Sequence, residues 1–139
     1  MFVLYDFFSR VDIKCKKFID LGSGDGKVVL LASLFGADAV GVEKIYLTGY
    51  TPAPKDRFGK ERSDFNKVSL GSENTTPWEQ KDIEKLIIEL KEEGFYVVSV
   101  EQQEGSIDYR KIPKHQKTVF IFGNEVDGVP EKIVSMSDF

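Results

Sequence analysis

The sequence predicts an α/β fold: a three-layer sandwich built on a mainly parallel sheet of about five strands. Short apolar segments alternate with helical patterns along the chain, which is typical of parallel sheets. Residues 17–49 run in the order strand, glycine turn, helix, strand, which is a βαβ unit. A chain of 139 residues is long enough for one core, so residues 1–139 are expected to form a single domain.

The βαβ unit opens with KFIDLGSG, residues 17–24, a buried strand that ends in glycines. The segment DGKVVLLASLFG, residues 25–36, is expected to be a helix that ends at Gly36. The segment ADAVGVEKIYLTG, residues 37–49, is apolar and β-branched and predicts the second strand. The crossover between two such strands should be right-handed.

A polar segment rich in Gly, Pro, Ser and Asn follows at residues 50–75. A loop of this length is usually functional or disordered, and we expect residues 52–75 to be the least ordered part. Residues 44–67 hold six basic and three acidic side chains. This excess could meet phosphate, or it could belong to a solvated loop.

A helix over residues 77–93 is predicted from its caps and its apolar periodicity. Thr76 is the expected N-cap, Pro77 the first helical residue and Glu79 the capping-box partner. Gly94 is expected to end the helix. One face carries apolar residues at helical spacing: Ile83, Leu86, Ile87 and Leu90.

Two further strands and a short helix complete the fold. The apolar segments FYVVSVE and KTVFIFG, residues 95–101 and 117–123, predict the strands. The segment VPEKIVSMS, residues 129–137, predicts a final helix that starts at Pro130.

Composition excludes several classes of protein. Cys15 is the single cysteine and there is one histidine, so no internal disulfide and no zinc site are expected. No apolar run approaches the ~20 residues that span a bilayer, so no membrane partner is expected and a cytoplasmic protein is the default. The net charge of −4 argues against a chain that is basic throughout.

The segment FIDLGSGDGKVVLLASLFGADAVGVE, residues 18–43, resembles the first motif of the Rossmann-like, class I S-adenosylmethionine-dependent methyltransferases. Gly22, Gly24 and Gly26 would let the backbone turn tightly beside a ligand. The resemblance implies that Asp20 holds the turn or the ligand's amine. It also implies that Glu43, at the end of the second strand, accepts the ribose hydroxyls.

From Glu43 onward the chain resembles a different family. The stretches VEKIYLTGYTPAP, KVSLGSENTTPWE and FIFGNEVDGVP, at residues 42–54, 67–79 and 120–130, are similar to those of SpoU-type (TrmH-like) RNA 2′-O-ribose methyltransferases of the SPOUT class. The resemblance implies a SPOUT-like fold, S-adenosyl-L-methionine as cofactor and tRNA or rRNA as partner. The implied cofactor-binding residues are Phe122, Gly123, Asn124, Glu125 and Gly128. The residues expected to contact RNA are Lys55, Arg57, Lys60, Arg62 and Lys67. A plain β-turn is the alternative for residues 123–129.

The chain departs from this second family in two ways. Members carry an arginine in the helix after the first strand that activates the ribose hydroxyl, whereas residues 11–56 contain no arginine. The catalytic residues therefore stay unknown. Members also continue, after the position of Phe139, with a strand and helix that complete a knot. An incomplete knot and a weakened homodimer are therefore expected.

Glu43 lies where the two resemblances meet, which indicates a chimera or a truncated gene. Residues 1–43 would be a class I-like βαβ opening, and residues 43–139 an incomplete SpoU-like region. Three hypotheses follow. The first is a relative of the SpoU-type RNA methyltransferases that is inactive as this fragment. The second is a class I fragment that acts on protein or a small molecule, and the third is a non-enzymatic chimeric remnant.

Overall fold

The computed structural model of the chain describes residues 16–21, 42–49, 51–63, 74, 77–108, 111–112, 117–124 and 126–139. The elements are, in chain order, β1 (Lys16–Leu21), β2 (Val42–Leu47), β3 (Trp78–Gln80), α4 (Ile83–Glu92), β4 (Tyr96–Val100), β5 (Thr118–Gly123) and α5 (Glu131–Met136). None of the helices in these ranges is long and apolar enough to cross a membrane. The helix predicted at residues 25–36 lies outside the described residues.

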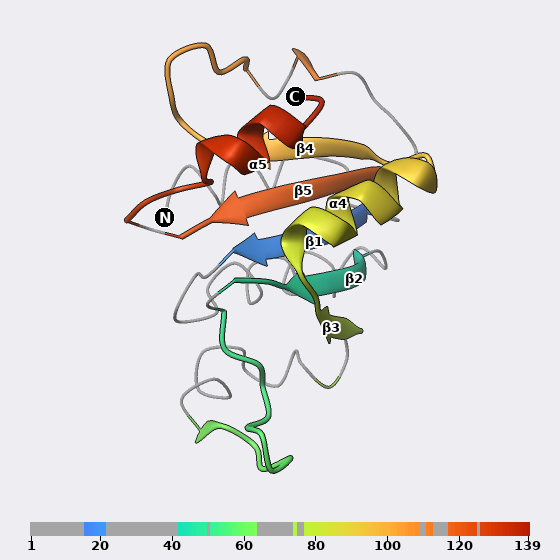
Figure 1. Cartoon of the computed structure of the whole chain (residues 1–139), viewed down its shortest axis with the longest axis vertical. Helices are drawn as coiled ribbons and strands as arrows, with labels where there is room; N and C mark the ends of the chain where they lie inside the picture. The colour runs from blue at the N-terminus through green and yellow to red at the C-terminus, as the bar shows by residue number, and fades with distance from the viewer. Residues whose placement is uncertain are drawn as a thin grey trace.

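The described strands form one five-stranded sheet in the order β3-β2-β1-β5-β4 (Figure 1). All neighbouring strands in it are parallel. The predicted α/β fold with a parallel sheet is therefore confirmed. Rossmann-like sheets have the order 3-2-1-4-5-6, with the fourth strand beside the first. Among the described strands, β5 takes that position and β4 lies at the edge, so the sheet departs from the order expected for the class I alternative.

Both faces of the sheet are buried, as expected for the middle layer of a three-layer sandwich. Val119 and Ile121 belong to a core cluster that includes residues of α4 and α5, so both helices pack on the same face. Successive side chains of a strand point to opposite faces, which places Phe120 and Phe122 on the other one. They are only 4% and 2% exposed. Figure 1 shows α4 and α5 side by side over the sheet.

The predicted helix begins later than its expected caps. Residues 78–80 form β3, which pairs in parallel with residues 45–47 of β2. The N-cap is Asp82, whose carboxylate accepts a hydrogen bond of 3.1 Å from the Lys85 N–H. The predicted start of the helix at Pro77 and the role of Glu79 as capping-box partner are therefore wrong, because residues 78–80 pair with β2, and Thr76 lies outside the described residues. The predicted apolar face is confirmed, and Gly94 follows the helix with a φ of +84°.

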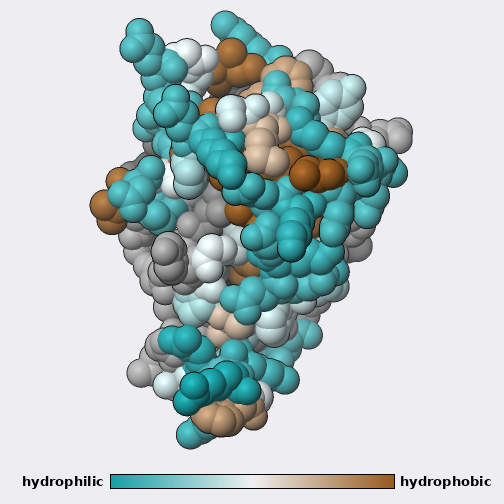
Figure 2. All heavy atoms as spheres, in the orientation of Figure 1, coloured by the Kyte–Doolittle hydropathy of each residue, from teal (hydrophilic) through white to brown (hydrophobic). Residues whose placement is uncertain are grey.

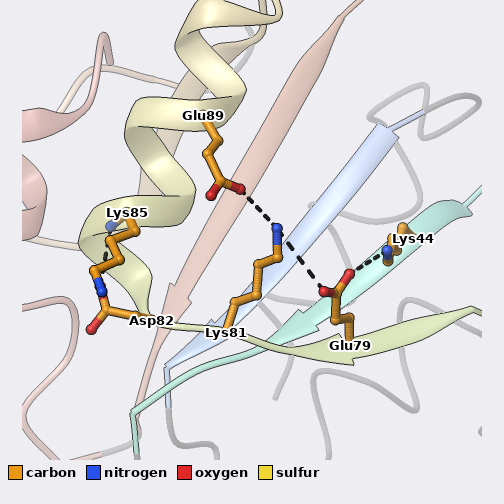
Figure 3. Close-up of polar contacts among 6 residues, drawn as sticks. All are labelled: Lys44, Glu79, Lys81, Asp82, Lys85 and Glu89. Carbon is orange, nitrogen blue, oxygen red and sulfur yellow. Dashed lines mark hydrogen bonds and ion pairs between the residues drawn. The ribbon is translucent and has the colours of Figure 1, made fainter.

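Glu79 joins a chain of charged side chains instead of capping a helix (Figure 3). Its carboxylate accepts a hydrogen bond of 2.5 Å from Lys44 of β2 and lies 4.0 Å from Lys81. Lys81 in turn donates a 2.7 Å hydrogen bond to Glu89 of α4. The bond from Lys44 lowers the pKa of Glu79 and raises that of Lys44, while the bond to Glu89 raises the pKa of Lys81. These charged contacts therefore connect the edge strand β3 to both β2 and α4.

Residues 54–62, within the segment expected to be the least ordered, form a hydrogen-bonded hairpin. Lys55 and Glu61 face each other in an antiparallel bridge. Between them, Asp56 donates its N–H to the Lys60 carbonyl (2.9 Å), and Gly59 turns the chain with a φ of +80°. Figure 1 shows the hairpin projecting beyond β3 at the lower end of the molecule. Side-chain hydrogen bonds and a glycine with positive φ organise this hairpin. Neither feature appears in a search for apolar periodicity, so the sequence analysis did not predict the hairpin.

The last described residues pair with the outer edge of β4. The Val97 carbonyl accepts a hydrogen bond of 2.8 Å from the Asp138 N–H, and the Ser99 N–H donates one of 2.8 Å to the Phe139 carbonyl. The Asp138 carboxylate accepts further hydrogen bonds of 2.8 Å from the Val97 N–H and from the Lys91 ammonium group. The chain after α5 thus covers the edge of the sheet.

Candidate functional site

The candidate site lies at the carboxyl edge of the sheet, where ligands bind in open α/β folds. The strand register brings the ends of three strands together there. Leu21 of β1 pairs with Gly123 of β5, and Asp20 pairs with Phe122. Phe122 pairs on its other side with Val100, the last residue of β4. Because neighbouring strands lie about 4.8 Å apart, the main chain of Asp20 is close to the predicted loop after β5.

The loop after β5 folds back on its own strand. The Gly128 N–H donates a hydrogen bond of 3.0 Å to the Asn124 carbonyl, which closes an antiparallel bridge between them. The Asn124 side-chain oxygen accepts hydrogen bonds from Val126 N–H (2.8 Å) and Asp127 N–H (2.7 Å). Asn124 was expected to anchor a ligand. Its side-chain oxygen shapes the loop, and its contact with a ligand stays a prediction.

Gly123 and Gly128 lie where an added Cβ atom would meet neighbouring atoms, namely the loop backbone at Gly123 and the Glu101 carboxylate at Gly128. A Cβ atom at Gly123 would lie 2.0 Å from the Gly128 carbonyl carbon. A Cβ atom at Gly128, where φ is +66°, would lie 2.1 Å from Oε2 of Glu101. Both glycines were expected to let the backbone wrap a cofactor. In the structure, they first let the loop pack on itself and on Glu101.

Glu101 is a site residue that the sequence analysis did not single out. Its Oε2 accepts a hydrogen bond of 2.7 Å from the Val129 N–H, and its Oε1 accepts one of 2.9 Å from the Gln102 N–H. It directly follows β4, as the last residue of the predicted strand segment FYVVSVE. The sequence did contain one signal for this role, namely an acidic residue at the carboxyl end of an apolar strand. Its partner lies 28 residues away, so the contact itself was not visible in the sequence.

The loop has a distinct hydrogen-bonding character toward a ligand. The N–H groups of Val126, Asp127, Gly128 and Val129 are all engaged in the contacts described above. In the described part of the loop, the carbonyl oxygens therefore carry the remaining hydrogen-bonding capacity, which suits a donor such as the exocyclic amine of adenine. The Val126 side chain is 90% exposed and offers an apolar contact for a flat ring. These features fit the adenine end of a nucleoside cofactor.

The other predicted cofactor residues are not all brought to this edge. Phe122 lies near this edge in the strand register, but its side chain is buried in the core. Glu43 was expected at the end of a strand, but β2 spans Val42–Leu47, and a register shift between β1 and β2 skips Glu43. Glu43 therefore lies near the amino end of β2, about 13 Å along the strand from Leu47 and away from the carboxyl edge of the sheet. The predicted residues Gly22, Gly24, Glu125 and Lys67 lie outside the described residues, as does Gly26.

The predicted RNA-contacting residues in the described ranges lie on the hairpin at residues 54–62. Lys55, Arg57 and Lys60 are exposed, and Arg62 is half-buried. Figure 1 shows this hairpin well separated from the loop after β5. The structure thus places the basic residues and the candidate cofactor loop in two different regions.

Comparison with protein families gives a match over most of the chain. The model of the SpoU rRNA methylase family matches residues 36–139. A tRNA (guanosine(18)-2′-O)-methyltransferase of Aquifex aeolicus (strain VF5) is 32% identical over 103 residues. That alignment covers 73% of this chain and 45% of the relative. The chain thus spans about half the length of the curated relative that it matches.

Solved structures share the fold over nearly the whole chain. The A. aeolicus TrmH/SpoU tRNA modifying enzyme has a TM-score of 0.66 at 24% identity, covering 98% of this chain and 68% of its own. An AdoMet-bound rRNA methyltransferase from Sinorhizobium meliloti has a TM-score of 0.68 at 25% identity, covering 96% and 48%. AviRb from Streptomyces viridochromogenes, in complex with AdoMet, has a TM-score of 0.67 at 16% identity, covering 96% and 49%. The predicted SpoU-type fold is confirmed, whereas the state of the knot stays a prediction.

Proposed function

Because the chain belongs to the SpoU rRNA methylase family, we propose that it supplies the cofactor-binding part of an RNA 2′-O-ribose methyltransferase. The reaction would transfer the methyl group of S-adenosyl-L-methionine to a ribose 2′-hydroxyl of tRNA or rRNA. The names of the A. aeolicus relative and of the AdoMet-bound S. meliloti structure support both the cofactor and the RNA substrate. A homodimer and a cytoplasmic location are part of the same proposal.

The observation that carries this proposal is the closed loop between Gly123 and Val129. Glu101 holds one end of the loop and Asn124 shapes the other, so its backbone is preorganised before a ligand arrives. Preorganisation reduces the entropy that is lost on binding. The carbonyl oxygens of the loop would accept the adenine amine, while Val126 would pack against the ring. When bound, S-adenosylmethionine supplies an electrophilic methyl group.

Turnover needs more than cofactor binding, because a ribose hydroxyl is a weak nucleophile that must be positioned and deprotonated. The family resemblance places an activating arginine in the helix after the first strand. Residues 11–56 contain none, so that role has no assigned residue in this chain. We therefore propose that this chain alone binds the cofactor without methylating RNA.

Nuclear magnetic resonance titration with S-adenosylhomocysteine tests the cofactor site. We expect shifts of the amide resonances of residues 123–129, and we expect Glu101→Gln to weaken binding. Glu104→Gln is the matched control, because Glu104 is an exposed acid in the segment after β4. An absence of shifts at millimolar ligand would overturn the assignment of the site.

A methyl-transfer assay separates cofactor binding from turnover. Labelled S-adenosylmethionine and a tRNA transcript would be incubated with the 139-residue chain, and we expect no label in the RNA. Incorporation into a ribose 2′-oxygen would support the family reaction but contradict the proposed lack of turnover. Incorporation into a base would contradict the proposed 2′-O-ribose chemistry.

A further inference from the structure

We propose that the hairpin at residues 54–62 is an RNA-reading element whose Phe58 stacks on an unpaired base while neighbouring basic side chains contact phosphates. The proposal rests on the proposed function for its assumption that the substrate is RNA. It adds a substrate class, namely RNA with an unstacked base, and a contact site separate from the cofactor loop.

The tip of the hairpin is organised by the Asp56 side chain and by backbone hydrogen bonds. The Asp56 carboxylate oxygen Oδ1 accepts hydrogen bonds from the N–H of Phe58 (2.8 Å) and of Lys60 (2.9 Å). The Gly59 N–H donates a 2.9 Å hydrogen bond to the Asp56 carbonyl, and the Arg62 N–H donates one of 2.9 Å to the Pro54 carbonyl. These bonds fix where the aromatic ring is presented, so little backbone entropy would be lost on binding.

Phe58 is exposed to solvent at this hydrogen-bonded tip. Its side chain is 79% exposed, although burial of an aromatic ring is normally favourable. The Arg57 guanidinium lies 4.8 Å from the centre of the ring. An exposed aromatic ring beside an arginine is the combination on which unpaired bases stack in proteins that bind single-stranded nucleic acid.

The charge of the hairpin suits a phosphate backbone. Residues 54–62 contain four basic and two acidic side chains, a net charge of +2 in a chain with a net charge of −4. Lys55, Arg57 and Lys60 are exposed. Figure 2 shows the hairpin at the lower end of the molecule as a largely hydrophilic surface with a hydrophobic patch at its tip. The ring would contact the base and the basic side chains the backbone around it.

The geometry favours single-stranded RNA over a duplex. Bases in a double helix are stacked on their neighbours. A single protruding aromatic ring can therefore stack on a base only in the loops, bulges and ends of an RNA, where base faces are free. A second protein surface is the other partner that an exposed aromatic residue could meet. A change in oligomeric state is therefore included as an outcome of the test.

Fluorescence anisotropy with the full chain tests the proposal, with a labelled single-stranded RNA and the corresponding duplex as probes. We expect Phe58→Ala to weaken single-strand binding about tenfold and duplex binding much less. Phe58→Trp should retain single-strand binding. The matched control is Ile88→Ala, which removes a 53% exposed apolar side chain from α4 and should change neither affinity.

Salt dependence identifies the phosphate contacts. Arg57→Gln and Lys60→Gln should each reduce the slope of log affinity against log salt by about 0.7 for the single strand. Unchanged single-strand affinity of Phe58→Ala would overturn the proposal. A shift of that variant's oligomeric state in sedimentation, with RNA affinity retained, would assign the tip to a protein contact instead.

The titration with S-adenosylhomocysteine is independent of these measurements. Binding of RNA that depends on Phe58, without any cofactor binding, would contradict the proposed function and leave the hairpin proposal intact. Cofactor binding combined with an RNA affinity that does not depend on Phe58 would contradict the hairpin proposal and leave the proposed function intact.

Discussion

Glu101 Oε2 accepts a hydrogen bond of 2.7 Å from the backbone N–H of Val129, which joins the end of β4 to the loop after β5. The same carboxylate oxygen occupies the space that a side chain at Gly128 would need. Val129 is only 5% exposed, so water would not readily replace the carboxylate. The position of the loop thus depends on an acidic residue from a neighbouring strand.

Removal of this carboxylate should destabilise the protein. Glu101→Ala leaves the part-buried Val129 N–H without its acceptor, which costs about 1–3 kcal/mol in the free energy of unfolding. Glu101→Gln keeps an acceptor oxygen and should cost less. Urea unfolding would measure both, with Glu104→Gln as the control. A stability for Glu101→Ala equal to that of the control would show that the loop does not depend on this bond.

Gly128→Ala should be more destabilising than Gly94→Ala. Both glycines have positive φ, +66° and +84°, and an alanine in this region costs roughly 1–2 kcal/mol. The Cβ at Gly94 would meet no atom within 4 Å, whereas the Cβ at Gly128 would collide with Glu101. Thermal unfolding of the two variants isolates the cost of the collision. Equal losses would show that the Glu101 carboxylate moves away without cost.

Asp138→Ala should destabilise the edge of β4. The Val97 N–H, in a fully buried residue, would lose its 2.8 Å hydrogen bond to the carboxylate, at a cost of about 1–3 kcal/mol. Lys91→Met removes only the exposed ion pair to Asp138, worth about 0–1 kcal/mol. Chemical unfolding would compare the two. A larger loss for Lys91→Met would mean that the ion pair dominates.

The Lys44–Glu79 pair should make stability depend on pH. The hydrogen bond from Lys44 lowers the pKa of Glu79 below its usual 4.5, so this contribution is present above pH 4.5 and lost as pH falls below it. The same bond raises the pKa of Lys44 above 10.5, so the contribution is lost again as pH rises beyond that value. The side chains are 31% and 40% exposed, so added salt should weaken the effect.

Unfolding of the wild type and of Glu79→Gln across this pH range tests the pair. The difference in the free energy of unfolding should be largest near neutral pH and shrink below pH 4.5. Glu104→Gln should show no such profile. A difference that is independent of pH would indicate that packing, rather than charge, accounts for the effect of the substitution.

Local patterns were sufficient for much of the fold. Apolar runs predicted β4 and β5, the spacing of Leu86, Ile87 and Leu90 predicted the buried face of α4, and Gly94 marked its end. These signals depend on a few neighbouring residues, so they can be detected without knowledge of the rest of the chain. The start of α4 was mispredicted because residues 78–80 have a partner in β2, far away in the sequence.

For the candidate site, the sequence by itself determined that a glycine-containing loop follows an apolar strand near Gly123 and Gly128, and it indicated the SpoU-type family. Only the tertiary structure decided what these residues contact. The sheet order placed Glu101 against the loop, and the bounds of β2 showed that Glu43 lies near the start of a strand and not at its end. The reason is physical: strand pairing and long-range hydrogen bonds join residues through space, and neither glycine content nor periodicity records which segments become neighbours.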